Sequence, residues 1–98
     1  MDALVDTGAS TTTLPSSILT ELGVEPIMQK SFRFAQGETR SLDVGQAFIR
    51  IEGQEFITQV VFNDEGTTPL LGAQSLEGAY MAVNPVDQTL VPVEGLLM

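Results

Sequence analysis

Short runs of β-forming residues, separated by glycine and proline turns, constrain the fold of this chain more than any other feature. Residues 29–34 alternate, with Phe32 and Phe34 on one face, as in a half-buried strand. Gly37 marks a turn, after which residues 39–44 return to form a hairpin. Further strands are expected at 1–5, 11–14, 47–51, 56–62, 80–83 and 89–93, with Gly45 as a bulge or corner and 63–68 as a polar loop. This pattern predicts an all-β sandwich or barrel.

Two short helical segments interrupt the β pattern. Pro15 stands where proline favours the first helical turn, and residues 16–22 follow with an apolar face. Gly23 is placed to end this helix in the left-handed conformation. A second helical turn is expected at 73–76, after Leu71 and Gly72.

The stretch Ala3–Ser10 carries the strongest chemical signal. An apolar run leads into Asp6-Thr7-Gly8, which predicts a buried strand that ends in a tight loop. A carboxylate at the end of a buried strand is costly unless it is paired, hydrogen-bonded or functional. The alternative is that these three residues form an ordinary turn, because Asp, Thr and Gly are all common turn residues.

Composition narrows the chemistry. The chain contains no Cys and no His, which removes thiolate nucleophiles, the Ser-His-Asp triad and nearly all zinc sites. No metal or other cofactor is therefore expected, and acid–base chemistry would depend on carboxylates. The net charge of −9 disfavours nucleic-acid partners. No apolar run approaches a membrane span of ~20 residues and no signal peptide is recognised, so a cytoplasmic location is expected.

The four basic residues all lie in the middle of the chain. They are Lys30, Arg33, Arg40 and Arg50. The simpler interpretation is a solvated hairpin that carries its solubilising charges. The functional alternative is a mobile hairpin that meets an acidic ligand. Four acidic residues at strand edges and in turns are expected to be solvated: Asp2, Asp43, Asp64 and Asp87.

The chain resembles the retropepsin-like aspartic proteases, the single-lobed relatives of pepsin. Residues 4–10 look like the family's apolar-apolar-Asp-Thr-Gly active-site loop. Leu70-Leu71-Gly72 resembles the apolar-apolar-Gly segment before the family's C-terminal helix, and the Gly37 hairpin lies between them, where the family has its flap. The resemblance implies one domain over residues 1–98, folded as a closed barrel with a flap hairpin and one or two short helices.

The resemblance also implies roles for individual residues. Asp6 would be the catalytic carboxylate, Thr7 would contact the backbone of a second chain, and Gly8 would donate its N–H to the carboxylate. Leu71 and Gly72 would support this loop from beneath. Ala9 would contact substrate, together with a flap tip formed by Ala35, Gln36 and Gly37.

One Asp-Thr-Gly per chain implies a homodimer in which two Asp6 carboxylates share a proton and activate a water to cleave a peptide or protein substrate. Family members usually carry one or two strands before this motif, whereas five residues precede Asp6 here, so an N-terminal strand is expected to be missing or replaced. The apolar tail 95–98 is expected to be buried, and residues 91–98 are available for a dimer interface.

Two alternatives remain open at this point. One is a catalytically silent β-module of the same fold that binds peptides or partner proteins. The other is an unrelated small β-barrel in which Asp6-Thr7-Gly8 is only a turn. Substitution of Asp6 by Asn abolishes proteolysis in the protease and changes little in the unrelated barrel. The silent module would dimerise and bind peptides without cleaving them.

Overall fold

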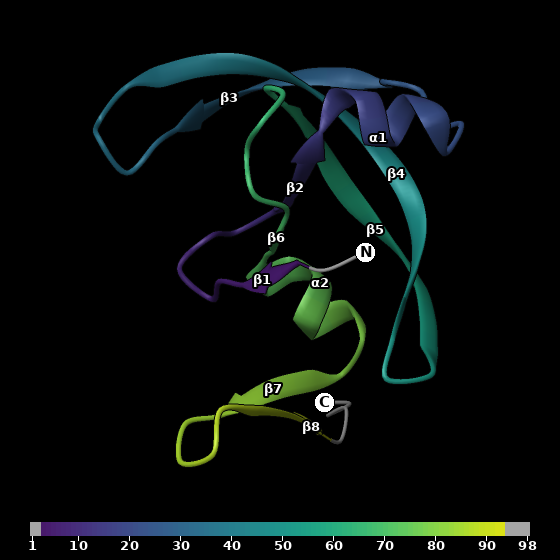
Figure 1. Ribbon diagram of the computed structural model, residues 1–98, viewed down its shortest axis with the longest axis vertical. Helices are drawn as coiled ribbons and strands as arrows, with labels where there is room; N and C mark the ends of the chain where they lie inside the picture. Colours follow the sequence, from purple (N-terminus) through teal and green to yellow (C-terminus); the bar gives the residue numbers. More distant parts are fainter. Residues whose placement is uncertain (1–2, 94–98) are drawn as a thin grey trace, which may run out of the picture.

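The polypeptide forms eight strands and two short helices across residues 3–93, the part of the chain that the computed structural model describes (Figure 1). The all-β class is therefore confirmed. The larger sheet has the order β1-β6-β2-β5-β4-β3, and β7 pairs with β8 in a separate two-stranded sheet. The strands are β1 (Leu4–Val5), β2 (Thr12–Pro15), β3 (Met28–Arg33), β4 (Thr39–Ile51), β5 (Gln54–Asn63), β6 (Leu70–Leu71), β7 (Met81–Asn84) and β8 (Thr89–Pro92); the helices are α1 (Ser16–Glu21) and α2 (Ala73–Gly78).

The long strand β4 connects two strands of the sheet, because it pairs antiparallel with both β3 and β5. The ladder with β5 continues through Gly45, which pairs with Val60, so no bulge forms there; Gly45 stands where β4 passes from pairing with β3 to pairing with β5, the corner that the sequence left open as the alternative. A Cβ atom at this position would lie 2.8 Å from the carbonyl oxygen of Glu25. The glycine is therefore explained by the close approach of a neighbouring backbone, not by a break in the strand.

Parallel and antiparallel pairings bring the two ends of the motif region together. β2 lies parallel to the second half of β5, and β6 pairs with β1 on one side and β2 on the other. Val5 thereby pairs with Leu71, which lies 66 residues further along the chain. The start of the Asp6 loop and the start of α2 therefore lie side by side.

The expected closed barrel is not formed within residues 3–93. The sheet has two free edges, β1 and β3, and no ladder joins them. Barrel closure requires every strand to pair on both sides. β1 and β6 are two residues long, which is too short to support such a ladder, and β3 extends away from them as one arm of the β3–β4 hairpin. The structure is an open, strongly curved sheet (Figure 1).

The apolar strand that leads to Asp6 was expected to be buried, and the structure corrects this. Leu4 and Val5 are 60% and 38% exposed. The reason is positional, since β1 lies at the sheet edge and pairs only with β6. Residues 1–2 of the expected strand lie outside the described residues.

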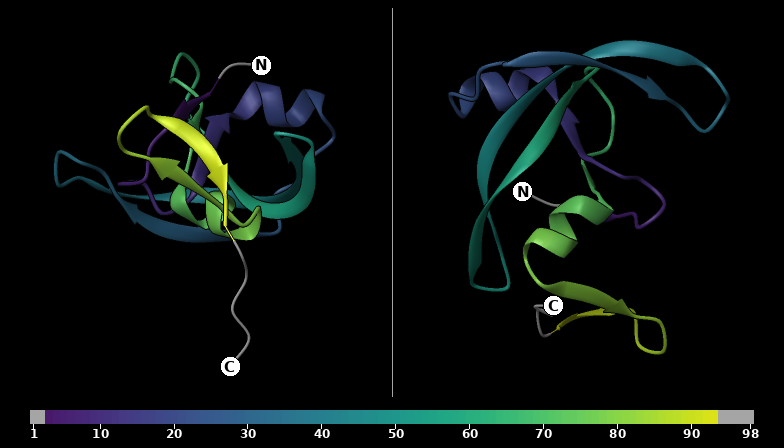
Figure 2. Two further views of the ribbon diagram at one scale, coloured as in Figure 1. Left: turned by 90° about the horizontal axis from the view of Figure 1, so that it is seen from below. Right: turned by 180° about the vertical axis from the view of Figure 1, so that it is seen from behind.

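Three apolar clusters hold the elements together. The first joins α1 to the sheet, the second lies beneath the β3–β4 hairpin, and the third joins α2 to the β7–β8 hairpin. The right-hand view of Figure 2 shows this last hairpin beyond α2, apart from the larger sheet. The buried members are Leu14, Leu19, Val60 and Phe62 in the first cluster; Leu42, Val44 and Val61 in the second; and Leu71, Leu76, Ala79 and Met81 in the third.

Local signals located the helices well. α1 ends at Glu21, one residue before the expected end. Gly23 follows with a φ of +80°, the left-handed conformation predicted for the glycine that ends this helix. The β7–β8 hairpin also forms where expected. The tail 95–98, expected to be buried, lies outside the described residues.

Candidate active site

Asp6 lies at the turn that follows β1, where its backbone and side chain are both held. Its N–H donates to the carbonyl of Leu71 at 3.0 Å, and its carbonyl accepts the N–H of Ala9 at 3.1 Å. Its carboxylate Oδ1 accepts the N–H of Gly8 at 3.0 Å. A Cβ on Gly8 would approach this same oxygen to 3.2 Å, so glycine allows the amide to reach the carboxylate closely. The carboxylate is half-buried and oriented by its own loop.

Helix α2 supports the loop from behind. Its first N–H groups have no partner within the helix, and no side chain caps it at Gly72. The N–H of Ala73 donates to the carbonyl of Ala9 at 2.8 Å, and that of Gln74 donates to Ser10 at 3.0 Å. The loop and the helix therefore satisfy each other's backbone groups, which fixes the loop on the third apolar cluster.

Gly72 is the tightest point of this arrangement. A Cβ there would lie 2.6, 2.8 and 2.9 Å from the C, O and N atoms of Thr11. These are backbone atoms, which cannot rotate away as a side chain can. Gly72 and Leu71 are buried, whereas Leu70 turns towards the cleft described next.

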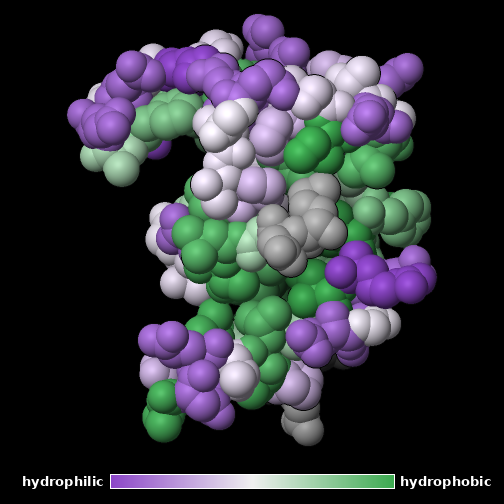
Figure 3. All heavy atoms as spheres, in the orientation of Figure 1, coloured by the Kyte–Doolittle hydropathy of each residue, from purple (hydrophilic) through white to green (hydrophobic). Residues whose placement is uncertain are grey.

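A cleft of about 900 Å³ opens between the Asp6 loop and the β3–β4 hairpin. Figure 3 shows it as the hollow on the left, with hydrophobic residues on the underside of the hairpin. Of the residues singled out by sequence, Asp6, Gly8, Ala9 and Ala35 line it, whereas Thr7, Gln36 and Gly37 do not. The remaining lining residues are Ser10, Thr11, Thr13, Phe32, Arg33, Phe34, Leu42, Val61, Asn63, Thr67, Thr68 and Leu70.

The end of the β3–β4 hairpin is a compact turn. The N–H of Phe34 donates to the carbonyl of Glu38, and that of Gly37 donates to Phe34, both at 2.8 Å. Gly37 has a φ of +90°, which explains the glycine. Residues 35–39 are exposed. Figure 1 shows this end projecting on the same side as the Asp6 loop.

An ion pair joins the hairpin, close to its turn, to the loop 63–69, which forms one wall of the cleft. Arg40 donates two hydrogen bonds to the Asp64 carboxylate, at 2.8 and 3.0 Å, and its Cζ lies 5.5 Å from the centroid of the Phe34 ring. The hydrogen bond and charge of Arg40 lower the pKa of Asp64, and the same contact raises the pKa of Arg40. Asp64 is exposed, as expected, but it is not merely solvated.

The same loop is also attached to α1. Ser17 donates its N–H to Glu65 at 2.9 Å and its hydroxyl to the other carboxylate oxygen. Both hydrogen bonds lower the pKa of Glu65. Since Pro15 offers no capping side chain, this carboxylate from a distant loop stabilises the helix N-terminus.

Comparison with known protein families assigns the chain to one of them. Residues 1–78 match the family described as "gag-polyprotein putative aspartyl protease". The chain belongs to this aspartyl protease family. No curated protein matches it. The matched range includes the Asp6 loop, the β3–β4 hairpin and α2, so the resemblance inferred from Asp6-Thr7-Gly8 and Leu70-Leu71-Gly72 is confirmed at the level of the family.

One feature of this aspartyl protease domain, a buried hydroxyl network, was not predicted from the sequence. Thr12, Thr58 and Ser75 are buried, and Ser75 Oγ lies 2.5 Å from Thr12 Oγ1 and 2.8 Å from Thr58 Oγ1. Thr12 Oγ1 also accepts the N–H of Gly72 at 3.0 Å. The network joins β2, β5 and α2 directly beneath the Asp6 loop. A small signal was present in the sequence, since Ser75 stands beside Leu76 on the face of α2 that must be buried.

Residues 3–93 of the domain contain no group of three or more side chains suited to hold a metal ion. No helix within this range is long and apolar enough to cross a membrane.

Proposed function

We propose that this chain is an aspartic endopeptidase that acts as a homodimer, with one Asp6 from each protomer in the active site. The observation that carries the proposal is the position of Asp6, a half-buried carboxylate in a cleft of about 900 Å³ within a domain of the aspartyl protease family. A cleft of this size suits several residues of an extended peptide.

The chemistry would require two carboxylates. Two Asp6 side chains close to a twofold axis could not both ionise easily, so the pair would hold one proton between them. The ionised carboxylate would take a proton from a bound water as it attacks the scissile carbonyl, and the protonated carboxyl would donate to the carbonyl oxygen. The Gly8 N–H, which donates to Asp6, would keep the carboxylate oriented.

Thr7 would act between the protomers. It is exposed, does not line the cleft, and its hydroxyl makes no hydrogen bond within residues 3–93. A contact from Thr7 to the loop of a second chain would hold the two Asp6 residues together. Leu71 and Gly72 would support this arrangement from below.

The β3–β4 hairpin would serve as the flap. Its end projects over the side of the molecule where the Asp6 loop lies (Figures 1 and 2). Ala35 already lines the cleft, and Gln36 and Gly37 would reach the substrate on closure. Closure would exclude water and offer backbone groups to an extended peptide.

The test is cleavage of an unfolded protein substrate by the wild type and by Asp6→Asn, across about pH 4 to 7, where a shared proton suits the chemistry. Asp6→Asn is expected to lower the cleavage rate by about a hundredfold to ten-thousandfold, because it removes a general acid–base group. Asp43→Asn, a substitution outside the cleft, serves as the matched control and should cleave normally.

Sedimentation of the wild type and of Asp6→Asn tests the dimer at the same time. The Asn variant should remain dimeric and be equally or more stable, because it removes a repulsion between like charges. A wild type that binds peptides as a dimer without cleaving them would instead indicate a catalytically silent binding module. Equal cleavage by both chains would contradict the assignment of Asp6.

A further inference from the structure

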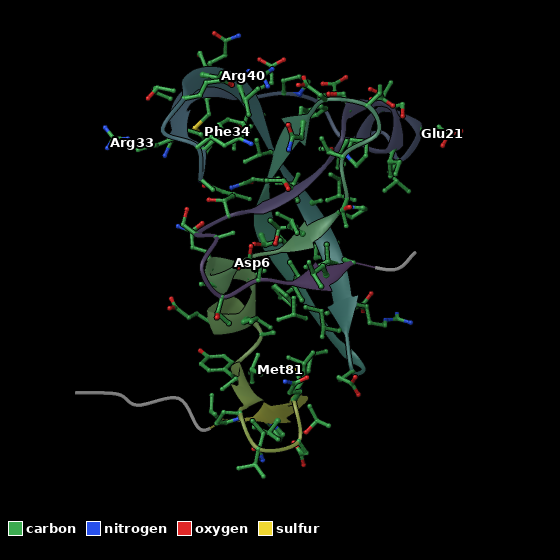
Figure 4. The ribbon with its side chains drawn as sticks, turned by 60° about the vertical axis from the view of Figure 1, so that its left-hand side comes forward. Asp6, Glu21, Arg33, Phe34, Arg40 and Met81 are labelled. Carbon is green, nitrogen blue, oxygen red and sulfur yellow. The ribbon has the colours of Figure 1, made fainter. Side chains whose placement is uncertain are left out.

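The ring of Phe34 forms part of the cleft on the hairpin side, and a charged side chain lies against it. Phe34 follows β3 and lines the cleft, and the Cζ atom of Arg40 lies 5.5 Å from the centre of its ring (Figure 4). Arg40 itself does not line the cleft. We propose that Arg40, held by Asp64, is a positioning residue that keeps Phe34 in the cleft wall and so determines how tightly a peptide binds. This inference rests on the proposed peptidase function and concerns substrate binding at the same site.

The contact with Asp64 orients the guanidinium of Arg40. Its Nη1 and Nη2 atoms donate to the two carboxylate oxygens of Asp64, at 2.8 and 3.0 Å. A bidentate pair of this kind is directional as well as attractive, because the planar guanidinium matches the carboxylate in geometry. The guanidinium therefore keeps one orientation relative to Asp64. A cation held over an aromatic ring attracts that ring, so Phe34 is stabilised in the same place.

Asp64 is a firm anchor, since the loop 63–69 holds its backbone. Its N–H donates to Asn63 Oδ1 at 2.8 Å, and its carbonyl accepts the hydroxyl of Thr67 at 2.7 Å. The carbonyl of Asn63 in turn accepts the hydroxyl of Ser16 in α1 at 2.9 Å. A continuous series of contacts thus runs from α1 through this loop to the β3–β4 hairpin.

Without this contact, the end of the hairpin would depend on partial packing alone. Residues 35–39 are exposed, and Phe32 and Phe34 are only partly buried against the second apolar cluster. An exposed ion pair adds little to the stability of a whole domain, but it can shift the equilibrium of a hairpin end that opens locally at a small cost. A peptide binds less tightly when the conformation that receives it is less populated. Loss of the contact should therefore weaken peptide binding.

The experiment measures binding of a neutral peptide, so that the charges of Arg40 and Asp64 do not act on the ligand directly. The peptide is apolar at its centre, has blocked ends and no ionisable side chain, and carries an uncharged fluorescent label. Fluorescence anisotropy gives its dissociation constant on a parent chain with Asp6→Asn, which removes the proposed catalytic carboxylate. We expect Arg40→Gln and Asp64→Asn each to raise the dissociation constant by about two- to fivefold, the size typical of an exposed ion pair.

A double-mutant cycle shows whether the two residues act through one contact. Arg40→Gln/Asp64→Asn should bind about as weakly as Arg40→Gln alone, because the contact is lost only once. Arg40→Lys keeps the charge but not the bidentate geometry, and should fall between the parent chain and Arg40→Gln. Arg50→Gln is the matched control. Arg50 forms an exposed ion pair with Glu55 at 3.1 Å outside the cleft, so this variant should bind like the parent chain.

Kinetics separate positioning from catalysis in chains that keep Asp6. Arg40→Gln should raise KM for the neutral peptide by the same factor as the dissociation constant and change kcat by less than about twofold, because Arg40 lies outside the cleft and touches no reacting group. Raising the salt from about 0.05 to 0.5 M should raise KM in the wild type, because screening weakens an exposed charge pair. The same change should have little effect on Arg40→Gln.

The contrary outcomes are equally distinct. Unchanged binding in both single variants, additive effects in the double variant, or an equal loss in Arg50→Gln would each overturn the role of Arg40. If cleavage persists in these cases, the peptidase proposal stays intact. Binding that weakens as expected in chains that cleave no peptide would support the role of Arg40 and overturn only the peptidase proposal. A chain that neither binds nor cleaves peptides would overturn both.

Discussion

The two sides of the cleft face one another but are held by different forces. On one side, the Asp6 loop is fixed by backbone hydrogen bonds to α2 and by the buried hydroxyl network of Thr12, Thr58 and Ser75. On the other side, the end of the β3–β4 hairpin is exposed, and an ion pair between Arg40, close to the hairpin turn, and Asp64 holds it. The contacts that anchor the loop are neutral and buried, whereas the hairpin adds a charged, solvent-exposed contact to the apolar packing of Phe32 and Phe34.

This difference fits the tasks that the proposed function assigns to each side. A carboxylate that must meet a second carboxylate needs a fixed position, which buried and mutually satisfied hydrogen bonds supply. A hairpin that must admit a peptide needs contacts that can be broken at small cost, and exposed ion pairs meet that need. The loop side should therefore respond to changes in packing, and the hairpin side to pH and salt.

The largest effect is expected from Gly72→Ala on the loop side. The new Cβ would meet the backbone of Thr11 at 2.6 Å, so either the loop or α2 must move. We expect a loss of about 3 kcal/mol in the free energy of unfolding, the upper range for overpacking. Chemical denaturation monitored by circular dichroism measures it.

Gly78→Ala is the matched control for this substitution. A Cβ at Gly78 would approach the flexible Phe56 ring at 3.4 Å, which is an ordinary contact, and alanine favours the helix. The control should change stability by less than about 1 kcal/mol. Equal losses in the two variants would mean that the loop is not packed as tightly against α2 as the structure indicates.

A smaller loss is expected from Ser75→Ala in the hydroxyl network. The substitution removes the partner of both Thr12 and Thr58 and leaves buried hydroxyls unpaired, which costs about 1 to 3 kcal/mol. Thr12 still accepts the N–H of Gly72 at 3.0 Å, whereas Thr58 keeps only a long hydrogen bond of 3.5 Å to the carbonyl of Gln59, so the loss concentrates on Thr58. The midpoint of urea unfolding gives the measurement, with the exposed Ser10→Ala as control.

The double variant Thr58→Val/Ser75→Ala separates hydrogen bonding from packing. Replacing both partners by apolar groups of similar shape should recover part of the stability that Ser75→Ala alone loses. If the double variant instead loses the sum of the two single changes, the hydroxyl contacts do not act as a network and the proposed difference between the two sides of the cleft weakens.

The distinction between contacts that are local in the chain and contacts between distant residues explains what the sequence could predict. Local signals succeeded: Gly37 and Gly23 both have positive φ at the turn and helix end where they were expected, and the alternation around Phe32 predicted β3. The Asp6 motif likewise indicated the family. In each case the residues that decide the structure lie within a few positions of one another, so a single short stretch contains the information.

Contacts between distant residues were not predictable in this way. Arg40 and Asp64 are 24 positions apart, Ser17 and Glu65 are 48 apart, and Thr12 and Ser75 are 63 apart. The prediction that β1 is buried was wrong for a related reason. Whether an apolar strand is buried depends on how many neighbours cover it, and the pattern of Leu4 and Val5 alone gives no information on that.

The smallest effect is expected on the hairpin side, from the titration of Asp64. Because Arg40 lowers its pKa in the folded protein, the ion pair contributes stability above the usual carboxyl value of 3.8 and loses it as the pH falls through the lower, folded-state pKa. Hydrogen exchange of the Phe34 and Gly37 amides, both bonded within the hairpin end, reports this local stability.

Protection of these two amides should therefore be constant from about pH 7 to pH 5 and decline below pH 4 in the wild type. Asp64→Asn should lower protection at neutral pH and remove the decline, whereas Glu21→Gln, a substitution of an exposed carboxylate on α1, should leave both unchanged. The amides of Ala73 and Gln74, which donate to the Asp6 loop, should be unaffected by Asp64→Asn. If they lost protection together with the hairpin amides, the two sides of the cleft would open as one unit, and the division between a fixed loop and a releasable hairpin would be wrong.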